Sequence, residues 1–258
     1  MSDLPLYIHG LMLVIGAAAL TWLLSLYLRN VAIVDTLWSV LFALLAWTYA
    51  LGQTQLGLRA VWVLLLVTLW ALRLSIHITR RNWGLPEDRR YQAIRARNEP
   101  HFALKSLYLV FVLQALLAWI ISLPVLGAIT SRQALTVLDY AGSALWLVGF
   151  VFEAGGDWQL ARFKATPGNE GKVMDRGFWS LTRHPNYFGD FCVWWGLYLI
   201  ALSAGAWWSL PGPLLMSVLL LRVSGVALLE KDIGERRPQY AQYVRRTNAF
   251  FPGPRRRA

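Results

Sequence analysis

Long hydrophobic runs recur along the chain, separated by short polar stretches. They cover residues 6–28, 31–51, 58–79, 104–129, 139–160, 188–208 and 212–230. Each run is long enough to cross a hydrocarbon layer, which needs about 20 residues of α-helix. The pattern therefore predicts an all-α, polytopic integral membrane protein with seven transmembrane helices, built as a single domain over residues 1–258.

Composition supports this class, and the charge distribution adds an orientation. Of the 258 residues, 57% are hydrophobic and 15% are charged, whereas a soluble protein carries about 25% charged residues. With seven spans, 21 of the 25 Lys and Arg residues fall in loops on one side, and only Arg59 and Arg132 on the other. The positive-inside rule then places the N terminus outside and the C terminus in the cytoplasm.

The net charge of +11 suits anionic membrane lipids and phosphorylated ligands. No soluble basic domain is present, so we expect no nucleic-acid partner. The single Cys192 and four scattered His residues give no disulfide framework and no metal-ligand spacing, so we expect no metal site. Arg255, in the basic end of the chain, is expected to be solvated or to touch lipid.

A dense polar motif opens one of the hydrophobic runs. It contains Arg183, His184, Asn186, Tyr187 and Asp190 around a proline. Ionisable groups at the edge of hydrocarbon are costly unless they are paired or bind a ligand, which favours a functional site. The alternative is an anchor whose side chains reach into the headgroups.

Other ionisable groups lie inside the predicted spans. Trp70, Arg73 and His77 share one face of the third span, and Asp35 and Trp38 share a face of the second. Such charges face the interior of a bundle or a wet cavity. They are consistent with a substrate site or with a structural Asp35–Arg73 ion pair.

Three polar segments complete the candidates. After Arg80 and Arg81, a Gly-Leu-Pro turn and two acidic residues predict a short amphipathic helix lying on the headgroups. The loop from Asp157 to Arg176 carries basic side chains that can cradle phosphates. Tyr240 and Tyr243, with arginines nearby, suit an adenine ring and its phosphates or an interfacial helix.

Two sets of motifs resemble the steroid 5α-reductase family. Residues 177–190, with Glu230, Tyr240 and Tyr243, look like its C-terminal domain. Residues 30–38 and 87–91 are similar to the bacterial, DUF1295-like branch. The likeness covers nearly the whole chain.

The resemblance implies a reductase that binds NADPH in a cytoplasm-facing cavity formed by residues 139–258, with substrate-side helices in residues 1–130. It implies reduction of the Δ4 C=C bond of a 3-oxo-steroid or a similar apolar enone that enters a monomer from the bilayer. The implied cofactor shell is Asp157, Lys164, Lys172, Asn186, Asp190, Arg222, Tyr240 and Tyr243, with Arg183 and His184 in the shared motif. We add the neighbouring polar groups Arg81, Arg162, Tyr187 and Glu230.

In that family a Gln-Glu pair and a Tyr engage the 3-keto group, whereas here these positions read Val34-Asp35 and Trp70. Hydride transfer to the β-carbon leaves developing charge on the carbonyl oxygen. We expect Asp35, with His77 or Trp70, to polarise that oxygen, and Trp38 and Arg73 to line the substrate site.

Two other classes remain open at this point. The Arg183–Tyr187 motif also occurs in isoprenylcysteine carboxyl methyltransferases, which use S-adenosylmethionine, a cofactor without phosphate. A transporter usually shows internal repeats, and none is visible in this sequence.

Overall fold

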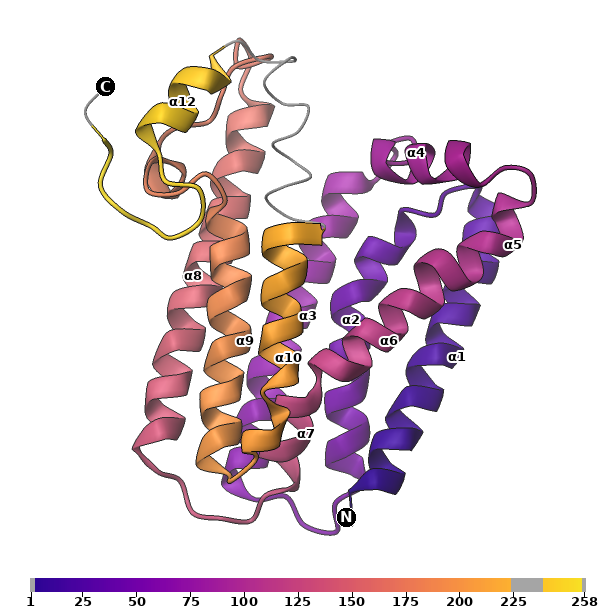
Figure 1. Ribbon diagram of the computed structural model, residues 1–258, viewed down its shortest axis with the longest axis vertical. Coiled ribbons are helices and arrows are strands. Elements are labelled where there is room, and N and C mark those ends of the chain that lie inside the picture. Colours follow the sequence, from indigo (N-terminus) through magenta and orange to yellow (C-terminus); the bar gives the residue numbers. More distant parts are fainter. Residues whose placement is uncertain (1–2, 224–238, 257–258) are drawn as a thin grey trace. The chain divides into compact units, whose positions relative to one another are not determined.

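The computed structural model describes residues 3–223 and 239–256, and each regular element in these ranges is a helix. The chain forms two compact units (Figure 1). Unit 1 comprises Met1–Leu135 and Ala201–Pro211, and unit 2 comprises Thr136–Ile200 and Gly212–Ala258. The single membrane domain stays a prediction, because compactness alone does not show whether the units fold together.

The predicted all-α class is confirmed for the described residues, and their long apolar helices are consistent with a membrane protein. Five helical segments among them are long and apolar enough to cross a membrane: Leu4–Leu28, Ile33–Leu51, Leu58–Asn82, Phe102–Ile121 and Val137–Ala165. The predicted run 104–129 is not one helix, because the chain breaks at Ser122 and a second helix follows.

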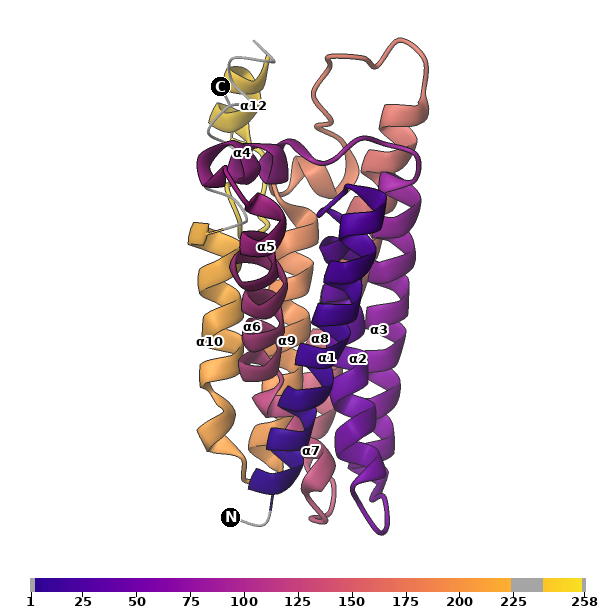
Figure 2. The same cartoon turned by 90° about the vertical axis from the view of Figure 1, so that its right-hand side faces the viewer.

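Unit 1 holds the first seven α-helices. They are α1 (Leu4–Leu28), α2 (Ile33–Leu51), α3 (Leu58–Asn82), α4 (Arg89–Asn98), α5 (Phe102–Ser106), α6 (Leu113–Ile121) and α7 (Leu123–Thr130), with a π-helical segment η1 (Leu107–Val112) between α5 and α6. The short helix α4 confirms the amphipathic helix expected after the Gly-Leu-Pro turn. It runs crosswise to α1–α3 at the end of unit 1 where α3 ends (Figures 1 and 2).

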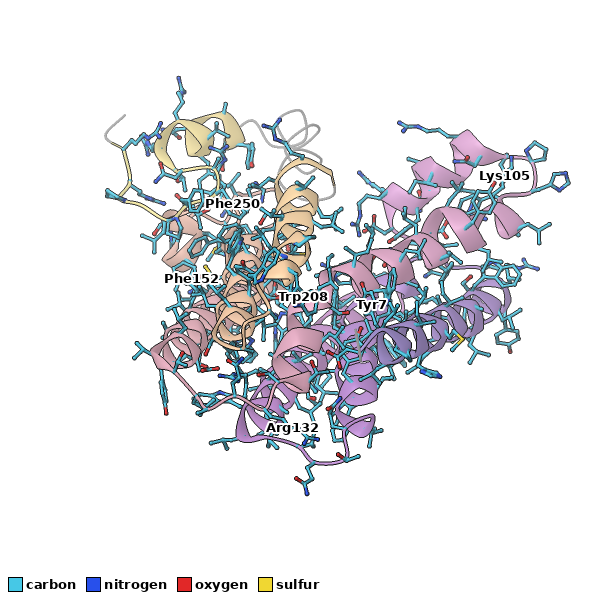
Figure 3. All side chains as sticks on the ribbon, turned by 60° about the horizontal axis from the view of Figure 1, so that its bottom comes forward. Tyr7, Lys105, Arg132, Phe152, Trp208 and Phe250 are labelled. Atoms are coloured by element: carbon cyan, nitrogen blue, oxygen red, sulfur yellow. The ribbon has the colours of Figure 1, made fainter. Side chains whose placement is uncertain are left out.

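The core of unit 1 forms where α2 packs against α1 and α3. Within this part of the protein, Tyr49 and Ser122 share a hydrogen bond of 2.9 Å. Beside Tyr49, near the start of α1, Tyr7 (labelled in Figure 3) stacks on Trp119 with ring centroids 4.1 Å apart. Tertiary hydrogen bonds and aromatic contacts thus hold helices that are otherwise apolar on all sides.

Arg59, expected in a loop, is buried in the first turn of α3 with 2% of its surface exposed. Its guanidinium donates to the carbonyl oxygens of Gln133 and Ala134, at 3.0 and 2.8 Å, and to Ser203 Oγ at 3.1 Å. Arg132, by contrast, is exposed (Figure 3). Arg59 therefore links the start of α3 to residues 133–134 and to Ser203 within unit 1.

Unit 2 contains α8 (Val137–Ala165), most of α9 (Pro185–Ser203), α10 (Pro211–Val218) and α12 (Tyr240–Arg246), with short helices η2 (Gly177–Ser180) and η4 (Leu219–Val223). Two pairs of glycines bring α8 and α9 into backbone contact. A Cβ on Gly149 would lie 2.5 Å from the Gly189 oxygen, and one on Gly142 would lie 2.6 Å from the Gly196 oxygen. Within each helix the glycines are two turns apart, which is how small residues let membrane helices approach closely.

Next to this helix pair, aromatic side chains tie α8 and α9 to the end of the chain. Phe188 lies between Phe152 and Phe250, with ring centroids 5.1 and 6.1 Å away (Figure 3). The C-terminal segment is therefore part of the packed body of unit 2.

Candidate functional site

The polar motif at the start of α9 fastens the C-terminal segment to unit 2. Arg183 is buried, and its guanidinium donates to the carbonyl oxygens of Val244 and Thr247, at 3.3 and 3.0 Å. Its backbone amide donates to the carbonyl of Asn248 at 2.9 Å. The last carbonyls of a helix have no partner within that helix, so Arg183 caps the end of α12.

The other residues of this motif lie close by: His184 and Asp190 are buried, and Asn186 and Tyr187 are half-buried. His184 stacks on Tyr187 with ring centroids 5.7 Å apart. Asn186 Nδ2 donates to Asp157 Oδ1 at 3.3 Å, which joins α9 to α8. Asp190 is 8% exposed, one turn further along α9. The predicted motif residues are thus brought together around the α8–α9 contact.

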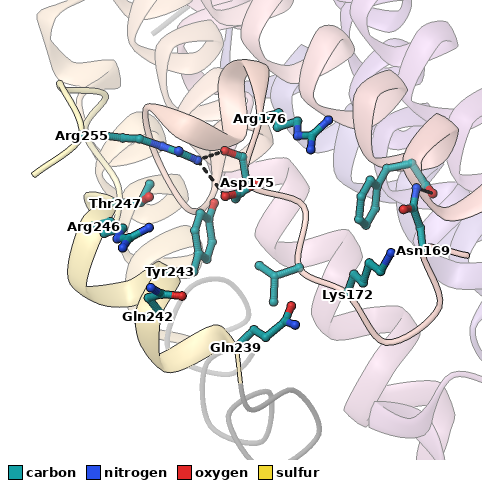
Figure 4. A pocket seen from close by; sticks show the side chains of 12 residues that line it. Asn169, Lys172, Asp175, Arg176, Gln239, Gln242, Tyr243, Arg246, Thr247 and Arg255 are labelled. Carbon is teal, nitrogen blue, oxygen red and sulfur yellow. Dashed lines mark hydrogen bonds and ion pairs between the residues drawn. The ribbon is translucent and has the colours of Figure 1, made fainter. Parts of the chain in front are cut away.

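A pocket of about 360 Å³ lies between the loop after α8, helix α12 and the chain end (Figure 4). We call it the basic pocket. It is lined by Phe163, Asn169, Lys172, Val173, Asp175, Arg176, Gln239, Gln242, Tyr243, Arg246, Thr247 and Arg255. Its volume lies in the range of small-molecule sites.

The basic pocket has a strong charge imbalance. Among the described residues that line it, four side chains are cationic, namely Lys172, Arg176, Arg246 and Arg255, and one is a carboxylate, Asp175. Arg255 donates to Asp175 Oδ2 at 3.0 Å and also to the Asp175 carbonyl oxygen. Such a lining favours an anion with several oxygens, because arginine binds phosphate and carboxylate in bidentate fashion.

Two uncharged groups of the basic pocket are fixed by the fold. Burial raises the pKa of the Tyr243 phenol well above its ordinary value, so the hydroxyl stays protonated and donates to the Trp179 carbonyl at 2.6 Å. Thr247 follows α12 directly and is 2% exposed. The pocket therefore combines cationic side chains with two buried hydroxyl groups, those of Tyr243 and Thr247.

Of the predicted cofactor residues, Lys172 and Tyr243 line this pocket. Tyr240 is buried, with its ring 5.7 Å from that of Tyr243. The exposed Arg162 guanidinium lies 5.5 Å from the Trp158 ring centroid.

Three further predicted residues lie away from the pocket lining or outside the description. Lys164 is exposed near the end of α8, and Arg222 is exposed in η4. Glu230 lies outside the described residues.

Sequence reasoning missed most of the pocket. Arg255, expected to be solvated or to touch lipid, instead pairs with Asp175 across 80 residues of chain. Arg176 belongs to the loop predicted to cradle phosphates, and Arg246 is one of the arginines near Tyr240 and Tyr243, although neither is in the predicted cofactor shell. Thr247 had none, because its burial depends on how the chain end folds back.

A second polar site lies within unit 1, where α2 meets α4. Both carboxylate oxygens of Asp35 are engaged by α4: Tyr91 Oη donates to Oδ1 at 2.5 Å, and Arg90 donates to Oδ2 at 2.8 Å. Gln114 donates to the same Tyr91 hydroxyl at 3.4 Å. The basic partner of Asp35 is thus Arg90 rather than Arg73.

Each of the two acidic residues before α4 accepts a hydrogen bond from a backbone amide near the start of a helix. Asp88 accepts from the Arg90 amide at 2.9 Å and caps α4. Glu87 accepts from the Val31 amide at 2.8 Å, just before α2, and from Arg95 at 2.9 Å. We call Asp35, Glu87, Asp88, Arg90, Tyr91 and Arg95 the Asp35 cluster.

Ionisation in the Asp35 cluster follows from these contacts. Burial on its own would raise the pKa of Glu87, but hydrogen bonds from Arg95 and the Val31 amide outweigh it and hold the pKa below its ordinary value. Burial, with Asp35 adding to it, raises the pKa of Tyr91 above its usual range. Glu87 is therefore an acceptor and Tyr91 a protonated donor at neutral pH.

The remaining predicted residues of unit 1 follow α2 and α3. Trp38 and Trp70 both pack edge-on against Phe42, with ring centroids 5.1 and 5.6 Å away, and Trp70 is fully buried. Arg73 and His77 are half-buried on α3. Arg81 is exposed and donates to Asn82.

Comparison with known proteins gives a family and one distant relative. The model of the family described as "Protein of unknown function (DUF1295)" matches residues 21–247. The chain is also 24% identical to "Uncharacterized protein C594.04c" of Schizosaccharomyces pombe over 281 residues, covering 95% of this chain and 79% of that protein. No solved structure matches the chain.

Proposed function

We propose that this chain, which belongs to the DUF1295 family, is a membrane reductase that uses NADPH to saturate the Δ4 C=C bond of a 3-oxo-steroid or a similar apolar enone. The observation that carries the proposal is the basic pocket, with four cationic side chains and one carboxylate in its lining. The resemblance of residues 177–190 to the steroid 5α-reductase family supplies the reaction.

The charge of the pocket favours a phosphorylated nucleotide over S-adenosylmethionine. NADPH carries a diphosphate and a 2′-phosphate, which Lys172, Arg176 and Arg246 can bind through charge-assisted hydrogen bonds. S-adenosylmethionine has no phosphate, and its sulfonium is itself cationic. A lining of this kind would repel that sulfonium.

The proposal assigns separate tasks to residues of the two units. In unit 2, the basic pocket binds the phosphates, and Arg183 holds α12 in place beneath it. In unit 1, Asp35 orients the Tyr91 hydroxyl, which supplies the exchangeable proton that Trp70 lacks. The cofactor, when bound, supplies hydride to the β-carbon of the enone.

We also retain the predicted topology as part of this proposal. Seven spans, with the N terminus outside and the C terminus in the cytoplasm, follow from the clustering of Lys and Arg in alternate loops. In a bacterial inner membrane this places the basic pocket on the side where NADPH is found. The apolar enone would enter from the bilayer as a membrane-dissolved substrate.

The direct test is the identity of the nucleotide held by the purified protein. Mass spectrometry of extracts should find NADP(H), and titration should show tighter binding of NADPH than of NADH. Oxidation of NADPH should then depend on an added 3-oxo-Δ4-steroid. Retention of S-adenosylmethionine without binding of pyridine nucleotides would replace the proposal with a methyltransferase.

A further inference from the structure

Asp175 and Thr247 both line the basic pocket, but they differ in whether their side chains already have a partner. Asp175 is the one carboxylate among the lining residues, and Arg255 is bound to it. Thr247 is 2% exposed, and among residues 3–223 and 239–256 nothing hydrogen-bonds to its Oγ1. A buried hydroxyl without a partner is costly, so its presence beside cationic side chains points to an acceptor supplied by a ligand.

We propose that Asp175 is an internal competitor for the pocket's ligand. Its carboxylate takes the position of a phosphate on Arg255, and ligand binding transfers Arg255 from Asp175 to a phosphate oxygen while Thr247 Oγ1 donates a second hydrogen bond. The identity of the ligand as a nucleotide rests on the proposed function, whereas the phosphate chemistry rests on the pocket alone.

The Asp175–Arg255 ion pair is suited to exchange. Its side chains are 48% and 44% exposed, and ion pairs this exposed contribute little because water and salt screen them. A phosphate dianion offers Arg255 twice the charge of the Asp175 carboxylate and can bind it in bidentate fashion, whereas the carboxylate contacts it through Oδ2 alone. Asp175 therefore binds Arg255 only weakly, and a stronger anion can replace it.

The tail that carries Arg255 is held independently of this pair. The Gly253 amide donates to the Leu181 carbonyl at 3.0 Å, and the Arg256 amide donates to the Arg246 carbonyl at 3.0 Å. Arg255 lies between these two anchors. Breaking its contact with Asp175 therefore moves a side chain and leaves the backbone in place.

The test uses the full-length protein and two probes, inorganic pyrophosphate and NADPH, titrated calorimetrically. Asp175→Asn removes the competitor, so pyrophosphate should bind about fivefold more tightly. Thr247→Val, which keeps the shape of the side chain, should weaken binding about fivefold. Glu170→Gln makes the same charge change at an exposed residue outside the pocket lining and should change affinity less than twofold.

A combined variant separates exchange from simple charge repulsion. In an Arg255→Gln background, Asp175→Asn should lose most of its tightening effect, because no ion pair is left to break. Weaker or unchanged binding in Asp175→Asn, with a normal unfolding temperature, overturns the inference.

The two probes distinguish this inference from the proposed function. Tightening toward pyrophosphate without any binding of NADPH supports the inference and sinks the nucleotide assignment. Binding of NADPH with an affinity that Asp175→Asn does not change supports the nucleotide assignment and contradicts the inference about Asp175.

Discussion

The Asp35 cluster and the basic pocket are both rich in arginine, yet they are neutralised to very different degrees. In the Asp35 cluster, three carboxylates face two arginines, and each arginine forms an ion pair of 3.0 Å or less. Among the described residues that line the basic pocket, four side chains are cationic and one is a carboxylate, which pairs with Arg255. A closed cluster stabilises structure, whereas an excess of one charge favours binding of the opposite charge.

Position in the chain sharpens this contrast. The Asp35 cluster lies wholly in unit 1 and clamps α4 onto the start of α2. The basic pocket lies wholly in unit 2 and forms where the chain end returns to the loop after α8. Arginine content alone would not have separated the two sites.

The largest effect should come from the helix pair that supports the basic pocket. In Gly189→Ala, the new Cβ would lie 2.4 Å from the Glu153 nitrogen and 2.5 Å from the Gly149 oxygen, which are backbone atoms of α8. We expect a loss of about 3 kcal/mol of stability and a loss of pyrophosphate binding. Thermal unfolding and calorimetry measure both.

Gly16→Ala is the matched control, because a Cβ there meets nothing within 4 Å. It should leave stability unchanged or raise it by up to about 1 kcal/mol. Equal effects at the two positions would contradict the close approach of α8 and α9.

The second prediction separates the two polar sites. Asp35→Ala leaves the buried Tyr91 hydroxyl without its acceptor and removes a partner from Arg90. We expect α4 to lose about 2 kcal/mol of local stability, measured by hydrogen exchange of its amides. Turnover should be abolished, while affinity for NADPH stays within twofold.

Tyr91→Phe is the conservative companion, and it should cost about 1 kcal/mol. A large loss of nucleotide affinity in either variant would mean that the two sites are not separate. Wild-type turnover in Asp35→Ala would remove Asp35 from the mechanism.

Helix positions and the course of α4 could be predicted from the sequence, because both depend on local signals. Apolar runs predict the approximate lengths of α1, α2 and α3. Asp88, just before Arg89, is a typical N-cap residue, so it marks the start of α4. α9 begins at Pro185 and ends at Ser203, whereas the predicted run was 188–208; proline is tolerated in the first turn of a helix.

The partners of the site residues could not be predicted, since they depend on how distant segments pack. Asp35 meets Tyr91 across 56 positions, and Arg255 meets Asp175 across 80. Arg183 was expected at the cofactor because of its motif, and the structure shows it bonded to backbone carbonyls of the chain end. A motif identifies which residues matter without saying what each one contacts.

The third prediction tests whether an arginine must line the basic pocket to affect binding, or whether a positive charge near the pocket is enough. Arg246 lines the pocket, whereas its neighbour Arg245 is exposed and does not. Arg246→Gln should weaken pyrophosphate binding about tenfold, since a charge-assisted hydrogen bond is lost. Arg245→Gln should change it less than twofold, and equal losses would reduce the pocket to a general basic surface.

The smallest effect concerns acid pH and the Asp35 cluster. The pKa of Glu87 lies below its ordinary value of 4.5 in the folded protein. Its contribution to stability is therefore complete above pH 4.5 and is lost as the pH falls through the folded-state pKa. Glu87→Gln should lower stability by roughly 0.5–1 kcal/mol at pH 7.

That difference between wild type and Glu87→Gln should disappear as the pH falls well below 4.5, because both side chains are then neutral. Thermal unfolding midpoints of the two proteins, measured from pH 7 to pH 3, follow it directly. Glu170→Gln, at an exposed loop carboxylate, should match wild type at neutral pH. A difference in unfolding midpoint that persists unchanged at pH 3 would show that Glu87 acts through its shape and not through its charge. It would contradict the view that ion pairs stabilise the Asp35 cluster.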